Sequence, residues 1–253
     1  MKNKVGGLIL SITLLAACGL VPLAKADTMV LCSGSNGYTG LVSAVVGSAG
    51  PSGAWNYQNP TTDATFRFGW SGASGYNLAG LFQFNDSNGT GIGTIKSSPT
   101  SITTIGDASL TLRVNQASSP AGSFTVALIT DPWNPQNLPA SGSLALPAYD
   151  TTSAITYSWS SQMANSTFFS INVTSLVQKM VDSTTDYYGF IIFGNDNQSY
   201  IGKIDNGFSS ADRVPKLSLN YTISAIPEPS TYALLLVGFG TVVGLRWYRR
   251  RVS

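Results

Sequence analysis

The stretch Leu110-Thr111-Leu112-Arg113-Val114-Asn115 alternates apolar and polar residues without interruption. Successive side chains of a β-strand point to opposite faces of the sheet, so this alternation predicts a strand with one buried face. The same period of two recurs in four further stretches: Ala64–Phe68, Phe124–Ile129, Phe169–Thr174 and Leu217–Thr222. Many short strands of this kind predict an all-β chain, folded as a single antiparallel β-sandwich.

Other stretches refine this prediction. Phe190–Phe193 is apolar at every position, which indicates a central strand buried on both faces. Ser175–Val181 has apolar residues at helical spacing, and it predicts one short amphipathic helix that covers an open end of the sandwich. We expect Thr174 or Ser175 to be the N-cap of this helix. We place the sandwich domain at residues 61–224, after an N-terminal extension with a leading strand at residues 27–60.

Composition excludes several functions. Residues 27–225 hold seven basic residues against 11 aspartates, a net charge of −4, which argues against nucleic acid as a partner. The chain has no histidine, so catalysis by a Ser-His-Asp or Cys-His constellation and zinc bound by histidine are excluded. A glycosidase would need two paired aspartates, and nothing in the sequence pairs them. We therefore expect a protein that is not an enzyme.

Residues 1–26 have the features of a signal peptide. Lys2 and Lys4 precede an apolar run, and Ala24-Lys25-Ala26 fits a cleavage site that would leave Asp27 as the first mature residue. Lipidation at Cys18 is the alternative, because Leu15-Ala16-Ala17-Cys18 resembles a lipobox. With cleavage after Ala26, Cys32 is the only mature cysteine, and it is either buried or paired with another chain.

The C-terminal segment, residues 225–253, carries three features in order. The motif Pro227-Glu228-Pro229 comes first, an expected transmembrane helix at residues 231–248 follows, and a basic tail at residues 249–251 sets a positive-inside orientation. This order resembles the PEP-CTERM sorting signal. The resemblance implies a precursor anchored in the inner membrane of a Gram-negative bacterium, processing by an exosortase, and delivery to the cell surface or extracellular matrix. Glu228 would then be a processing determinant.

The part between the two ends resembles the DNRLRE-type β-sandwich, a jelly-roll-like module related to carbohydrate-binding modules. Six stretches carry this resemblance: Gly80–Phe84, Ala108–Leu112, Thr130–Asn134, Phe169–Val177, Tyr188–Ile192 and Arg213–Tyr221. The chain departs from the pattern after Trp133, where a stretch rich in proline, serine and leucine stands. The resemblance implies a sandwich fold and extracellular polysaccharide as a partner.

Aromatic side chains near polar loops are the usual means of holding a sugar ring. The candidate sugar-binding residues are Trp55, Trp70, Tyr76, Trp133 and Trp159. The alternative for each is that it fills the core of the sandwich. Asp196 and Asp205 lie in oxygen-rich turns and are weak candidates for a structural Ca²⁺ site, although such residues also form turns unaided. We expect no other cofactor.

Two functions remain open. The first is an exported protein of the cell surface or matrix that binds exopolysaccharide through its sandwich. The second is a structural or adhesive surface protein without a sugar site.

Overall fold

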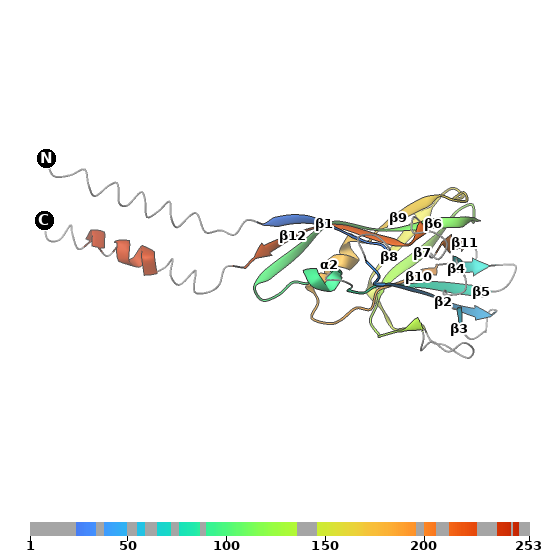
Figure 1. Cartoon of the computed structure of the whole chain (residues 1–253), viewed down its shortest axis with the longest axis horizontal. Helices are drawn as coiled ribbons and strands as arrows, with labels where there is room; N and C mark the ends of the chain where they lie inside the picture. The colour runs from blue at the N-terminus through green and yellow to red at the C-terminus, as the bar shows by residue number, and fades with distance from the viewer. Residues whose placement is uncertain are drawn as a thin grey trace. The chain divides into compact units, whose positions relative to one another are not determined.

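The computed structural model describes most of the chain between the predicted signal peptide and the sorting motif, and two short segments beyond it. The described residues are 24–33, 38–49, 55–58, 65–71, 76–86, 90–135, 146–195, 200–205, 213–226, 237–243 and 245–247. They form 12 strands, the α-helix α2 (Thr174–Asp182), the 3₁₀ helix η1 (Ile92–Ile95) and helical turns at residues 237–243 and 245–247 (Figure 1). Residues 1–23 of the predicted signal peptide, which include Cys18, and the motif at residues 227–229 lie outside the described residues. The all-β prediction is confirmed.

The chain divides into two compact units. The smaller unit contains residues 1–25, 98–102 and 223–253. The larger unit contains residues 26–97 and 103–222, and it holds the helix α2 and most residues of both β-sheets.

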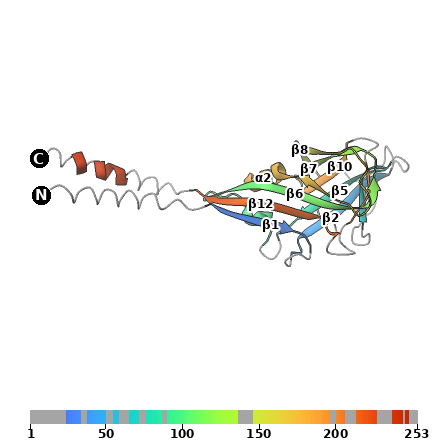
Figure 2. The same ribbon diagram turned by 90° about the horizontal axis from the view of Figure 1, so that it is seen from above.

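Four strands form the first sheet. They lie in the order β1 (Lys25–Leu31), β12 (Lys216–Ala225), β6 (Ser101–Ser118) and β9 (Phe168–Asn172). Figure 2 shows β12 between β1 and the long strand β6. The pairing of β9 with β6 is antiparallel, with Leu110 opposite Ile171 and Leu112 opposite Phe169.

The second sheet is built around β5. Its path runs β3 (Trp55–Gln58), β2 (Leu41–Ala49), β5 (Tyr76–Phe84), β10 (Phe190–Gly194), β7 (Gly122–Ile129) and β8 (Tyr149–Trp159). The first residues of β5 also pair with β4 (Thr65–Ser71). β11 (Tyr200–Asp205) pairs with β4 on one side and with the last part of β6 on the other. The hydrogen-bonded path is therefore continuous from the first sheet into the second.

The main core lies between the two sheets. The Phe124 ring of β7 contacts the Phe169 ring of β9, with 6.1 Å between their centroids. The Tyr157 ring of β8 lies 5.5 Å from that of Phe169. Direct cross-strand partners share a face, so Leu110, Leu112 and Ile171 belong to the same layer. The stretch at residues 110–115 therefore buries the face that its alternation predicts.

A second apolar cluster covers the other face of the second sheet. Its buried members are Ala44, Val46, Ala79, Leu81, Ala127, Ile129, Trp133 and Ile191. β10 pairs with β5 and β7 and is buried on both faces, so the prediction of a central strand at Phe190–Phe193 is confirmed. Trp133, which follows β7, belongs to this cluster, and Leu146, which precedes β8, packs against it.

The predicted helix is confirmed as α2, but the predicted N-cap is wrong. Val173 occupies the cap position and makes no capping side-chain bond. The side-chain oxygen of Asn172 accepts the Thr174 N–H instead, at 3.0 Å. The Thr174 hydroxyl accepts a hydrogen bond from the Ala108 N–H of β6 at 2.9 Å, so it ties the helix to the sheet. The side chain of Gln178 adds two more bonds to β6, with the Ile105 N–H and the Thr103 carbonyl.

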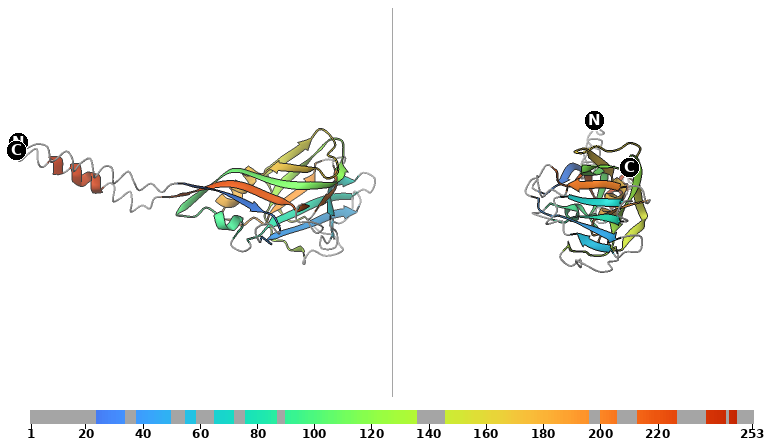
Figure 3. Two further views of the ribbon diagram at one scale, coloured as in Figure 1. Left: turned by 45° about the horizontal axis from the view of Figure 1, so that its top comes forward. Right: turned by 90° about the vertical axis from the view of Figure 1, so that its right-hand side faces the viewer.

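Residues 27–60 contribute more than the single leading strand that we expected. They contain most of β1, all of β2 and all of β3. β2 pairs with β5 from Leu41 opposite Phe84 to Ala49 opposite Tyr76, so it is a full member of the second sheet (Figure 3).

Candidate functional site

The smaller unit contains a turn and the strand end that precedes the sorting motif. Ser98 and Ser101 exchange backbone hydrogen bonds of 2.8 and 3.2 Å across Pro99 and Thr100, which closes a tight turn at the start of β6. The Ile226 N–H then donates to the Thr100 carbonyl at 2.8 Å. Backbone pairing therefore continues to the residue immediately before Pro227.

The side chain of Ser98 supports this turn. Its hydroxyl lies 2.8 Å from the Ser101 hydroxyl and 3.2 Å from the Thr100 hydroxyl, and it accepts the Thr100 N–H at 3.3 Å. Little apolar surface is buried here, because Ile102 is 51% exposed and Ile226 is 38% exposed. Hydrogen bonds in such exposed places open more easily than those of a core strand.

Beyond the motif, residues 237–243 and 245–247 are helical. Among the described residues, no helix is both long enough and apolar enough to cross a membrane.

Trp133 is a packing residue of the second apolar cluster. It is 9% exposed, and its indole N–H donates to the Tyr188 carbonyl at 2.8 Å. A buried indole whose N–H is already bonded to backbone offers no open face to a sugar ring.

Trp159 also lies inside the fold. It is 9% exposed, its ring lies 5.6 Å from that of Phe124, and its indole N–H donates to the Ser119 carbonyl at 3.0 Å. Trp133 and Trp159 are therefore both buried inside the fold, as the alternative interpretation of these residues predicts.

The other three aromatic candidates lie at the ends of β3, β4 and β5, and their side chains lie outside the described part of the structure. The strand register places them. Trp55 is opposite Ser48, Ser48 is opposite Asn77, and Asn77 is opposite Trp70. These four positions form one cross-strand row, which we call the Trp55–Trp70 row. Tyr76 belongs to the next row, opposite Ala49 and Ser71, and hence to the other face of the sheet.

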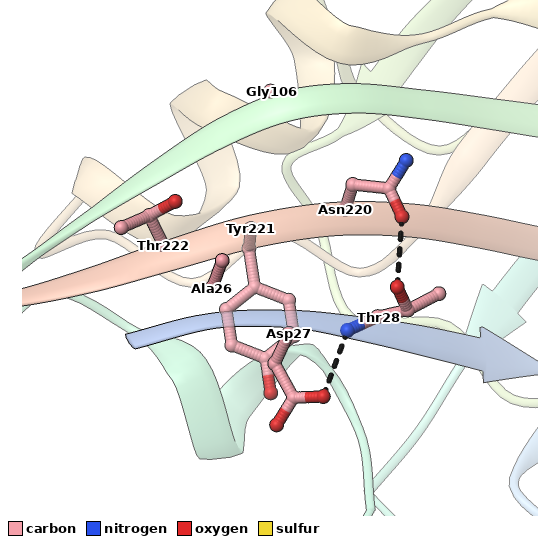
Figure 4. A pocket seen from close by; sticks show the side chains of 7 residues that line it. All are labelled: Ala26, Asp27, Thr28, Gly106, Asn220, Tyr221 and Thr222. Atoms are coloured by element: carbon pink, nitrogen blue, oxygen red, sulfur yellow. Dashed lines mark hydrogen bonds between the residues drawn. The ribbon is translucent and has the colours of Figure 1, made fainter. Parts of the chain in front are cut away.

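A shallow hollow of about 410 Å³ lies on the first sheet, over β1, β12 and β6 (Figure 4). It is lined by Ala26, Asp27, Thr28, Gly106, Asn220, Tyr221 and Thr222. The Thr28 hydroxyl donates to the Asn220 side-chain oxygen at 3.0 Å. Sequence reasoning missed this hollow, because it depends on which strands become neighbours. The predicted signal cleavage after Ala26 falls inside β1, beside this hollow.

Asp150 and Lys179 form a structural ion pair in the larger unit. The Asp150 carboxylate accepts hydrogen bonds from the Lys179 ammonium at 2.5 Å, from the Ser153 hydroxyl at 2.6 Å and from the Thr152 hydroxyl at 2.6 Å. These donors, the lysine first, hold the pKa of Asp150 well below its usual range. The pair joins α2 to the start of β8, at a place where no sequence motif indicates a site.

Cys32 is half-buried, and burial raises the pKa of its thiol. A thiol of raised pKa is a poor nucleophile at neutral pH. The described residues contain no group of three or more metal-ligating side chains. Asp196 lies outside the described residues, and only the backbone of Asp205 is described, so the weak Ca²⁺ prediction stays untested.

The clearest functional feature of the chain is the segment that follows β12. Comparison with protein families identifies that feature: residues 225–251 match the PEP-CTERM protein-sorting motif. The match supports an exported protein that an exosortase processes at the membrane. No curated protein is similar enough in sequence to the chain to count as a match.

Proposed function

We propose that the mature protein is a non-enzymatic component of the cell surface or extracellular matrix and that it binds extracellular polysaccharide through its β-sandwich. The sorting motif supports the location, because its presence implies export and exosortase processing. The Trp55–Trp70 row supports the ligand class.

Within this row, two tryptophans flank a serine and an asparagine on adjacent strands. Neighbouring strands lie about 4.8 Å apart, so three spacings separate the tryptophan positions by roughly 14 Å. An extended polysaccharide chain could lie across such a row, with sugar rings on the aromatic residues and hydroxyl groups on the polar residues between them. Trp133 and Trp159 take no part in this proposal because they are buried.

The alternative is a structural or adhesive role without a sugar site. One observation favours it: Ser48 has the same strand parity as Val46 and Ala44, so the row shares its face with the second apolar cluster. Trp55 and Trp70 would then extend that cluster and stabilise the fold.

Co-sedimentation with exopolysaccharide of the producing organism separates the two roles. Trp55→Ala and Trp70→Ala should each reduce retention at least tenfold and leave the melting temperature within a few degrees. Tyr76→Ala is the matched control, because its position lies on the other face, and it should retain the parent's binding. Unchanged binding of both tryptophan variants, or a loss of folding in both, would favour the structural role.

A further inference from the structure

We propose that the backbone pairing of Ile226 with Thr100 controls access of the exosortase to the sorting motif. The inference rests on exosortase processing and adds a regulatory step to it. In the paired state the chain before Pro227 is part of a β-structure, and in the open state it is a free extended segment. Only the open state is a substrate.

The first argument is the position of the Ile226–Thr100 pair directly before the motif. The Ile226 N–H is bonded to the Thr100 carbonyl at 2.8 Å, and Ile226 is followed directly by Pro227. Proline has no N–H, so the first residue of the motif cannot donate a backbone hydrogen bond. No spacer separates the paired strand end from the residues that the enzyme reads.

The second argument is the way in which a protease binds an extended substrate. Extended peptides are commonly recognised by backbone hydrogen bonds, as an added strand. A backbone group that is already bonded within the substrate cannot make such a bond. If the enzyme contacts the residues just before the motif, the Ile226–Thr100 bond must break first, and cleavage then follows the population of the open form.

The third argument is that the surroundings of the pair allow the Ile226–Thr100 bond to open. Ile226 is 38% exposed and Ile102 is 51% exposed in the paired state, so opening this end uncovers only part of each side chain. The turn that presents the Thr100 carbonyl depends on Ser98, whose hydroxyl bonds to Thr100 and Ser101. The strength of the pairing is therefore set by residues outside the motif.

The test measures the rate at which the full-length precursor is converted to the processed form, in a Gram-negative host that also produces an exosortase. A Gly-Ser-Gly-Ser insertion between Ile226 and Pro227 moves the motif away from the pair without removing it. We expect processing to become roughly two- to tenfold faster, which corresponds to the opening of one exposed backbone hydrogen bond. Ser98→Ala, which weakens the turn, should also accelerate processing.

Combining the two changes makes the test specific. Once the spacer is present, Ser98→Ala should have no further effect, because the pair no longer restricts the enzyme. Thr151→Ala, at an exposed position of β8, is the control for a general effect of substitution. Unchanged or slower processing of the spacer variant would overturn the proposal. Absence of conversion in every variant, the parent included, would overturn exosortase processing as well.

Discussion

The indole N–H of Trp133 donates a hydrogen bond to the backbone carbonyl of Tyr188, 55 positions further along the chain. This bond fastens the segment after β7 to the segment before β10. It also fixes the tryptophan over the second apolar cluster, where Ala127, Ile129 and Ile191 are buried. An aromatic residue that resembles a binding residue in the sequence thus holds two parts of the fold together.

Substitution of Trp133 should therefore lower stability. Trp133→Ala removes a large buried side chain and should reduce the free energy of unfolding by about 3–5 kcal/mol. Trp133→Phe keeps most of the ring but leaves the Tyr188 carbonyl without this donor, at a cost of about 1–3 kcal/mol. Urea denaturation checks both values. An effect of Trp133→Ala as small as that of a surface change, below about 0.5 kcal/mol, would contradict the packing role.

Gly189 is a position that only glycine fits. Its φ of +101° is unfavourable for other residues, and an added Cβ would lie 2.0 Å from the Phe82 carbonyl oxygen. Gly189→Ala should destabilise the fold by more than about 2 kcal/mol, because strain and steric overlap act together. Gly106→Ala is the matched control: its Cβ would meet nothing closer than 3.7 Å. Equal melting temperatures of the two variants would count against this account of Gly189.

The Asp150–Lys179 pair predicts a dependence of stability on acid. The native pKa of Asp150 lies below the value of an unfolded aspartate, so the native state favours the ionised form. The contribution of the Asp150 carboxylate to the free energy of unfolding is fully present above about pH 5 and is lost as the pH falls through the native pKa. Asp150→Asn should lower the urea midpoint at pH 7. Between pH 5 and pH 2, the midpoint of this variant should fall less than that of the parent.

Asp186 provides the comparison for that prediction. Its carboxylate is bonded to Lys96 at 2.7 Å, but its side chain is 70% exposed, whereas that of Asp150 is 11% exposed. Exposed ion pairs contribute little to stability. Asp186→Asn should change the pH 7 midpoint less than Asp150→Asn does, and the reverse order would contradict a structural role for Asp150.

Much of the fold follows from local pattern, and the remainder depends on partners far away in the chain. The alternation at residues 110–115 predicts a strand because one face of β6 is buried there. The start of β8 could not be predicted from the sequence. Its first residues, Tyr149 to Ser153, do not alternate between apolar and polar side chains, and each is either partly buried or exposed. Among the described residues β8 pairs only with β7, so its sequence is under weaker constraint.

The candidate site divides in the same way. The sorting motif is local, so its residues can be read directly from the sequence. The burial of Trp133 depends on a carbonyl 55 residues away, and the separation of Tyr76 from Trp70 onto different faces depends on strand register. Likewise, no local signal connects Thr100 with Ile226.

Glu228→Gln tests the role of the motif's carboxylate. The substitution keeps the shape of the side chain but removes its charge, and we expect the precursor to stay in the membrane fraction without processing. Ser230→Ala, next to the motif, is the control and should be processed like the parent. Normal release of the Glu228→Gln protein would exclude this carboxylate as a processing determinant.

The intact mass of the protein released from the producing cells is the most direct single measurement. Processing at both ends predicts a chain that begins at Asp27 and ends near the Pro227–Pro229 motif, without the apolar segment and the arginines at positions 249–251. A released protein that still carries residues 231–253 would contradict exosortase processing. A diacylated chain that begins at Cys18 would contradict cleavage after Ala26.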